Sequence, residues 1–435
     1  MSNSNTREQV NQINQSYWAY VKRQFAKNKR AVFAMYFILA LALVAIFADF
    51  LANDKPLVAK YQGKVIFPIL KSYAVDLGIA KWPPELQNVQ WKNLEYDFSV
   101  FPPIPYLPTY LDYTNVLKSP TEEQNLPNGW RWKHWLGTDN LGRDVMSGMI
   151  HATRIAFAVG IISMSISSLI GILFGALAGF YGDERLKVSR IRFIFNIIFF
   201  ILGGFYAFGV RSYTLSDALA TSAVSLLIQL IISLVIFAAV IFLGNLLAKP
   251  FERIPFLGKK VPAPMDIMVS RLIEILVSIP RLFLIIAIVA TMKSPSLVMV
   301  MLIIGLTSWT GIARLIRAEL LKVRRLEYIE AAQSLGYSNW RILLRHAIPN
   351  ALSPVLIAIA FGIASAILIE AFLSFIGVGV PAEVVTWGSL LNLARTHSSA
   401  WWLAIFPGFA IFLTVTFFNL IGEGLTDALD PRLKR

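Results

Sequence analysis

The stretch of sequence that decides the fold runs from residue 155 to residue 180 and reads IAFAVGIISMSISSLIGILFGALAGF. It contains no charged residue, and it exceeds the roughly 20 apolar residues that a helix needs to cross a bilayer. The composition of the whole chain agrees, because 56% of its 435 residues are hydrophobic and only 15% are charged. Soluble globular domains carry more charge, so the sequence predicts an all-α polytopic membrane protein built as a helical bundle.

Seven further stretches are long and apolar enough to cross a membrane, which brings the expected total to about eight spans. Lys and Arg flank the spans at alternate ends, so the positive-inside rule places both ends of the chain in the cytoplasm. The net charge of +14 therefore reflects basic loops rather than a nucleic-acid surface, and we expect no nucleic-acid partner. The seven stretches are residues 31–51, 193–210, 224–247, 267–292, 297–316, 351–378 and 401–421.

Residues 52–133, between the first two spans, are predicted to form an extracytoplasmic insertion. Its prolines exclude a regular helix over residues 101–110, and residues 65–67 favour at most a short strand. We expect a small irregular domain with a few strands. The prolines concerned are Pro102, Pro103, Pro105 and Pro108.

Several classes of chemistry are excluded by the residue types present. Without Cys there is no disulfide, thiolate metal site or Cys nucleophile, and the four His lack the spacing of a metal centre. No GxxxxGKS/T loop occurs, so no ATP site is expected. The start of the chain lacks the pattern of a cleavable signal peptide. We therefore expect a chain without its own cofactor or metal, rather than an enzyme.

The longest basic loop, between the sixth and seventh spans, reads YIEAAQSLGYSNWRILLRHAIPN over residues 328–350. This pattern predicts a helix, a break at Gly336 and a second short helix capped by Ser338, with Pro349 starting the next span. In the short helix, Trp340, Leu343 and Leu344 are spaced to form an apolar ridge. Such a ridge needs cover, either from a groove on a partner that moves the loop or from lipid headgroups.

At this point the sequence resembles the EAA loop of ABC import permeases, on Glu330, Ala331, Ala332, Gly336 and Pro349. His346 stands where the pattern usually has an apolar residue, as in peptide-type permeases. The resemblance implies that residues 318–350, here called the EAA loop, dock on a separate ATPase subunit. The residues expected to make this contact are Glu330, Ala331, Ala332, Gly336, Trp340, Arg341, Leu343, Leu344 and Pro349.

A second motif, WLGTDNLGRD over residues 135–144, resembles the LGTDxxGRD element of dipeptide, oligopeptide and nickel permeases. Its structural interpretation is a glycine turn with Asp139 or Asp144 capping the outer end of a helix. Its functional interpretation is an outer mouth that meets a substrate-binding protein. The residues of this motif are Gly137, Thr138, Asp139, Gly142, Arg143 and Asp144.

A third motif, EAFLSFIGVGVP over residues 370–381 followed by TWGS, also resembles this family. Ionisable residues within spans are costly, so Glu370 is a candidate for a gate, for a packing partner of Arg281, or for a substrate ligand. Glu274 and Arg281 bracket Pro280, which should kink the fifth span. The candidate gate and pathway residues are Glu370, Ser374, Gly377, Gly379, Glu274 and Arg281.

The resemblance implies the other components of the transporter. They are a homologous permease that forms a heterodimer with this chain, two ABC ATPase subunits that bind ATP and Mg, and an extracytoplasmic substrate-binding protein, all at the bacterial cytoplasmic (inner) membrane. The long outer segment resembles that of the second peptide-permease subunit of a microcin-C-type subgroup, which favours peptides over nickel as substrate. The alternative is a secondary transporter or channel in which Glu274, Arg281 and Glu370 form an ion path.

The expected organisation adds two insertions to a six-span core. Residues 193–247 form a two-helix hairpin where the family has a short cytoplasmic link, and two helices leave the orientation of later spans unchanged. The closing residues 427–432 resemble the family's DPR element. The segments are 1–30 (cytoplasmic), 31–51 (first span), 52–133 (outer insertion), 134–180 (LGTD motif and second span), 181–264 (hairpin with its flanks) and 265–435 (permease core).

Overall fold

The computed structural model describes residues 17–76, 78–87, 89–126, 129, 132–221, 223–290, 296–381 and 383–429. The last residues of the fifth predicted span, 291–292, and residues 430–432 of the predicted DPR element lie outside these ranges. The chain divides into two compact units. One comprises Met1–Ser165, Ile286–Pro295 and Leu356–Arg435, and the other comprises Ile166–Ile285 and Ser296–Val355.

The described residues contain seven helices long and apolar enough to cross a membrane, or eight if one bent pair counts as a span. The predicted polytopic helical bundle is therefore confirmed. The seven are Lys29–Ile46 (α3), Val145–Tyr181 (α6 with a π-turn at Leu177–Tyr181), Arg190–Gly209 (α7 with a π-turn), Ile228–Phe251 (within α9, Ala223–Phe251), Leu297–Val323 (α13), Ser353–Phe375 (α17) and Trp402–Leu429 (α19).

Three of these helices extend beyond the apolar runs that predicted them. Helix α6 begins at Val145 rather than at residue 155, because Asp144 caps it and Arg154 within it pairs with Asp49 at 2.8 Å. Helix α13 continues past residue 316, and α19 continues past residue 421. Hydropathy marks the membrane-embedded part of a helix, whereas caps and ion pairs decide where the helix ends.

The fifth predicted span is a broken helix rather than one kinked helix. Helices α11 (Met265–Ser278) and α12 (Arg281–Ala290) meet at an angle of 77°. Ile279 between them is extended, with φ −96° and ψ 124°. The residue before a proline avoids helical backbone, so Pro280 ends α11 outright.

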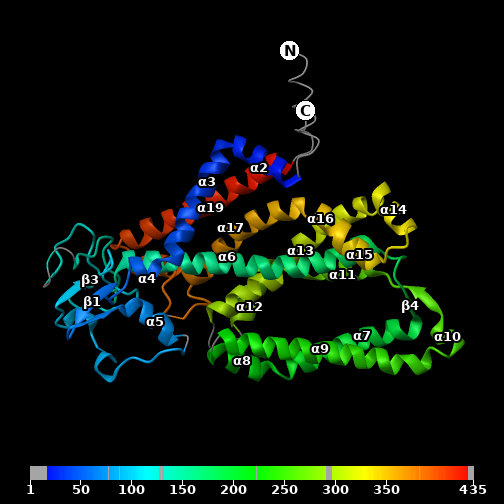
Figure 1. Cartoon of the computed structure of the whole chain (residues 1–435), viewed down its shortest axis with the longest axis horizontal. Helices are drawn as coiled ribbons and strands as arrows, with labels where there is room; N and C mark the ends of the chain where they lie inside the picture. The colour runs from blue at the N-terminus through cyan, green and yellow to red at the C-terminus, as the bar shows by residue number, and fades with distance from the viewer. Residues whose placement is uncertain are drawn as a thin grey trace, which may run out of the picture. The chain divides into compact units, whose positions relative to one another are not determined.

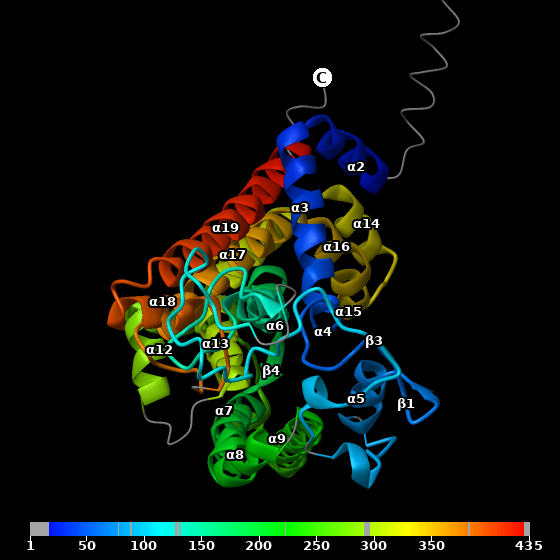
Figure 2. The same ribbon diagram turned by 90° about the vertical axis from the view of Figure 1, so that its left-hand side faces the viewer.

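In the first unit, the N-terminal helices pack on the C-terminal one (Figure 2). Helix α3 lies along α19, and α2 (Tyr17–Lys27) contacts the same helix. Asn28 caps α3 by accepting a hydrogen bond from Ala31 N, and its amide donates to Asp427 at 3.0 Å. The close approach requires Gly424, since a Cβ there would lie 2.2 Å from the Ala31 Cβ.

The outer insertion contains a three-stranded antiparallel sheet, in the order β2-β1-β3. No helix is found over residues 101–110, and β2 matches the predicted short strand, so both predictions are confirmed. The elements are α4 (Ala48–Leu51), β1 (Val58–Tyr61), β2 (Lys64–Ile66), α5 (Pro68–Asp76), β3 (Phe98–Val100) and 3-10 turns at Pro84–Leu86 and Trp91–Asn93.

In the second unit, α7 and α9 run side by side as the predicted hairpin (Figure 1). Strands β4 (Lys187–Ser189) and β5 (Lys260–Pro262) pair at its base, an element that the sequence did not predict. The polar Asn245 and Asn196 join the two helices at 2.7 Å. The hairpin is completed by α8 (Ser212–Thr221) and α10 (Pro255–Gly258).

Candidate functional site

The EAA loop has the predicted helix, break and helix. Helix α14 (Glu327–Ser334) ends before Gly336, whose φ of +81° belongs to the left-handed region that favours glycine. Ser338 then caps α15 (Asn339–Ile342) by accepting from Arg341 N at 3.4 Å. A π-turn (Leu343–Ala347) and α16 (Ile348–Ala351) follow, so Pro349 precedes the seventh span, which begins with α17, instead of starting it.

The exposed face of this loop differs from the predicted ridge. Trp340 is 55% exposed and Leu344 is also exposed, but Leu343 is only 2% exposed and lies in the core. Ala332 is buried as well. The π-turn rotates the helix after Ile342, which is itself fully buried and which the sequence analysis missed. The residues available to a partner are Glu330, Ala331, Gly336, Trp340, Arg341, Leu344 and Pro349.

Contacts within the second unit attach the EAA loop to the neighbouring helices. Asn350 donates to the Tyr328 hydroxyl at 3.2 Å and to the His346 carbonyl at 2.7 Å. Helix α16 packs against α13, and Arg324 donates to the Gly179 carbonyl at 3.4 Å. These contacts join the EAA loop to α13 and to the end of α6.

The LGTD motif forms the predicted turn. Gly137 and Gly142 have φ of +79° and +76°, and a Cβ on Gly142 would lie 1.9 Å from the Asp112 carbonyl oxygen. The Asp139 carboxylate is buried, accepts from Arg143 N at 2.9 Å and pairs with Arg143 Nε at 2.6 Å. The Thr138 hydroxyl accepts from the backbone N–H of Lys118 at 2.9 Å. All of these contacts are made within the chain itself, as the structural interpretation of the motif predicts.

Asp144 caps α6, accepting from Ser147 N at 2.6 Å, as the structural interpretation predicts. The other oxygen of its carboxylate lies 2.8 Å from Nδ1 of His134, a fully buried residue that the sequence analysis did not single out. On the other side of the ring, His134 Nε2 lies 3.3 Å from Asp112. Burial would raise the pKa of Asp112, but hydrogen bonds from Thr114, Asn115 and His134 hold it below its usual value.

Glu370 is buried inside the first unit, with 2% of its surface exposed. It accepts a hydrogen bond from the Ser374 hydroxyl at 2.7 Å. Helix α17 packs tightly on α18 (Trp387–Thr396), because a Cβ on Gly388 would lie 2.3 Å from the Ala371 carbonyl oxygen. Gly377 and Gly379, with φ of +80° and +99°, form the turn after α17. Glu370 thus bonds within its own helix, whereas Arg281, its predicted packing partner, donates to Ser308.

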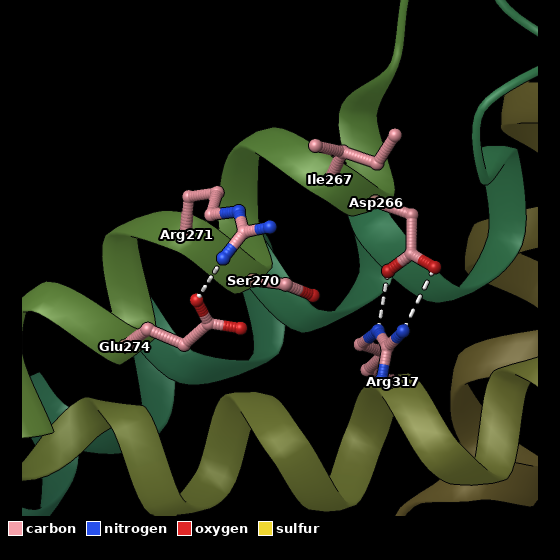
Figure 3. A pocket seen from close by; sticks show the side chains of 6 residues that line it. All are labelled: Asp266, Ile267, Ser270, Arg271, Glu274 and Arg317. Carbon is pink, nitrogen blue, oxygen red and sulfur yellow. Dashed lines mark hydrogen bonds and ion pairs between the residues drawn. The ribbon is translucent and has the colours of Figure 1, made fainter.

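The inner part of α11 carries charged side chains beside α13 (Figure 3). The Arg317 guanidinium binds both oxygens of Asp266, with Nη2 2.8 Å from Oδ2. Arg271 and Glu274 pair at 2.6 Å. Apart from Glu274, the sequence analysis named none of these residues. Beyond the break, Arg281, the first residue of α12, donates to the Ser308 hydroxyl of α13.

No cluster of three or more His, Asp or Glu that could hold a metal ion occurs among the described residues.

Two family models match the chain. Residues 256–435 match the binding-protein-dependent transport system inner membrane component. Residues 16–63 match the N-terminal transmembrane domain of oligopeptide transport permease C.

Relatives match over most of their length. A glutathione transport system permease protein of Pectobacterium atrosepticum is 30% identical over 326 residues, which cover 75% of this chain and 78% of the relative. An inner membrane ABC transporter permease protein of Escherichia coli is 27% identical, covering 96% of this chain and 97% of the relative. A peptidoglycan transport system permease protein of Agrobacterium fabrum is 25% identical, covering 94% and 92%. The chain therefore belongs to the binding-protein-dependent transport system inner membrane component family, as a multi-pass inner-membrane permease subunit of an ABC importer.

Proposed function

We propose that this permease imports peptides or a related small solute together with a second, homologous permease. We further propose that two ATPase subunits power the import and that one of them binds the EAA loop of this chain. The observation that carries the proposal is the exposed face around Trp340 on a loop attached to α13 and α6. ATP and Mg bind to the ATPase subunits, and an extracytoplasmic protein delivers the solute.

The chemistry of the exposed face supports a protein partner. Trp340 and Leu344 are apolar, Arg341 beside them stacks 4.9 Å above the Tyr337 ring, and Glu330 adds an acidic group. Aromatic and Arg side chains at the centre of a patch are typical of residues that dominate a protein interface. With this loop inside the cell, both ends of the chain lie in the cytoplasm.

The substrate class rests on the relatives. Their names specify dipeptide, glutathione and peptidoglycan transport. These compounds share peptide bonds, so we propose a peptide or peptide-containing solute for this importer as well. The partner permease and the binding protein supply the remaining specificity.

The test is copurification of ATPase with tagged permease from the native host, comparing Trp340→Ala with Trp401→Ala. Trp401 is 44% exposed and precedes α19, so the two changes remove the same side chain at similar exposure. Truncating a central interface Trp costs more than about 1.4 kcal/mol, so Trp340→Ala should lower the retained ATPase roughly tenfold.

Trp401→Ala should leave the ATPase at its wild-type level. The proposal is wrong if wild-type permease brings down no ATPase, or if both variants retain equal amounts. Uptake by proteoliposomes driven by an ion gradient without ATP would instead indicate a secondary transporter.

A further inference from the structure

Two contacts with α13, one from α11 and one from the first residue of α12, set the depth of α11 in the membrane. The Asp266–Arg317 pair lies near its start, and Arg281 reaches Ser308 beyond its end. At 1.5 Å per residue, Arg317 lies about 9 Å from the last residue of α13, and Ser308 lies near the middle of that helix. Since α13 crosses the membrane, the residues of α11 between these contacts lie in the inner half of the bilayer.

Two charged side chains in this part of α11 point away from the unit's own core. Arg271 and Glu274 are 73% and 60% exposed while they pair with each other. A charged group facing hydrocarbon costs several kcal/mol, so charged residues at this depth face water or another protein surface. This side of α11 is therefore not a lipid-facing surface.

The other positions of α11 divide into separate faces with the period of a helix. Val269 and Ile273 are buried in the second unit's core. Met268 and Leu272, one turn apart, are exposed apolar residues on a second face. The third face is a polar strip, defined by Ser270, Arg271 and Glu274, beside which Ile267 is also exposed. The apolar face suits contact with lipid or protein, and the polar strip faces water or another protein surface.

The polar strip borders an open hollow of about 340 Å³ that Asp266 and Arg317 complete (Figure 3). Its side chains include both signs of charge. An Arg guanidinium binds a carboxylate with two parallel hydrogen bonds, and a Glu carboxylate accepts from an ammonium group. A peptide with free ends offers both of these groups.

We propose that the polar strip of α11 lines the inner half of the aqueous pathway, where Arg271 binds the carboxylate and Glu274 the ammonium of a passing peptide. Without a peptide the two side chains neutralise each other as the observed pair. The assignment rests on the proposed peptide-import function and adds to it the residues that meet the charged termini. Exposed ion pairs of this kind are weak, so Arg271 and Glu274 can separate and bind the charged groups of a passing peptide instead.

The absence of Cys from the natural sequence allows a direct test. Single Cys residues are placed at 271 and 274, and as matched controls at 268 and 272 on the apolar face. The intact transporter in inside-out vesicles is treated with a charged, membrane-impermeant thiol reagent. Thiolates react and form readily only in water, so positions 271 and 274 should react at least about tenfold faster than 268 and 272.

A peptide mixture from a casein digest serves as the probe. It should slow labelling of Ser270→Cys, which lines the same hollow and keeps both Arg271 and Glu274, whereas the same digest with acetylated amines and esterified carboxylates should not. Equal labelling at all four positions, or none at 271 and 274, overturns the pathway assignment. Fast labelling without protection by the free digest overturns peptide binding by this pair. Each variant is also tested for copurified ATPase, so loss of coupling is distinguished from failure of this inference.

Discussion

At the scale of single residues, Lys92 in the outer insertion is held in a cage of aromatic rings. Its Nζ lies 3.5 Å from the ring centre of Tyr106, 3.8 Å from Tyr110 and 4.8 Å from Trp132. Burial lowers the pKa of Lys92 from 10.5 to about 7, although the nearby Asp54 and other carboxylates raise it. The rings favour the cation and burial disfavours it, so this lysine can change charge at neutral pH.

The lowered pKa predicts that the insertion becomes more stable as pH rises from about 7. In that range the unfolded Lys92 still holds its proton, while the folded form loses it, and stability rises wherever the unfolded state binds more protons. Hydrogen–deuterium exchange of peptides from residues 89–126 measures this. The excess protection of wild type over Lys92→Met should grow between pH 7 and 9. Exposed Lys64 supplies the control, since Lys64→Met should leave the pH dependence unchanged.

At the scale of elements, α6 and α13 approach so closely that only glycine fits between them. A Cβ on Gly175 would lie 2.5 Å from the Ala313 carbonyl oxygen, and one on Gly179 would lie 2.7 Å from the Arg317 carbonyl oxygen. Small residues at such spacing are the usual means by which membrane helices pack backbone to backbone. Helix α13 leads directly into α14 of the EAA loop.

Gly175→Ala should therefore lower the free energy of unfolding by about 1–3 kcal/mol, the range for overpacking. Gly311→Ala is the matched change in α13, because nothing lies within 4 Å of the Cβ it would add. Alanine there should be neutral or stabilising by about 0.5–1 kcal/mol. Thermal unfolding of both variants in detergent measures the difference, and equal melting temperatures would show that α6 and α13 do not pack this way in the membrane.

These elements also show which features of the fold can be predicted from the sequence. Local signals predicted the break at Gly336 and the cap at Ser338, because a turn or cap depends on residues a few positions apart. The Asp144 cap was predicted from the motif, but hydropathy placed the start of the second span at residue 155, because His151 and Arg154 interrupt the apolar run. The buried His134 that binds Asp144 was missed because it lies ten residues away in the sequence. The burial of Leu343 was missed because it depends on a π-turn and on neighbouring helices.

At the scale of the whole molecule, the two ends of the α7–α9 hairpin lie side by side, where β4 pairs with β5. Val188 faces Val261 across the strand pair, and the Ala263 N–H donates to the Leu186 carbonyl at 2.7 Å. The contacts of α7 and α9 are mainly with each other and with their own connecting segments. The inserted hairpin is thus closed at its base by backbone pairing, as an excisable module would be.

Replacing residues 189–260 with Asn-Gly tests this directly. Val188 and Val261 would then flank a two-residue turn of the type that Asn-Gly favours in antiparallel strands. We expect the shortened permease to fold, to elute as one species in detergent and to copurify with ATPase at the wild-type level, because the EAA loop and α13 keep their contacts. As a matched variant, the shortened permease also carries Val188→Pro, which removes a backbone N–H donor from the strand. This variant should fold less well than the shortened permease that keeps Val188. Aggregation of the Asn-Gly variant, or loss of its ATPase, would instead mean that the hairpin supports the core.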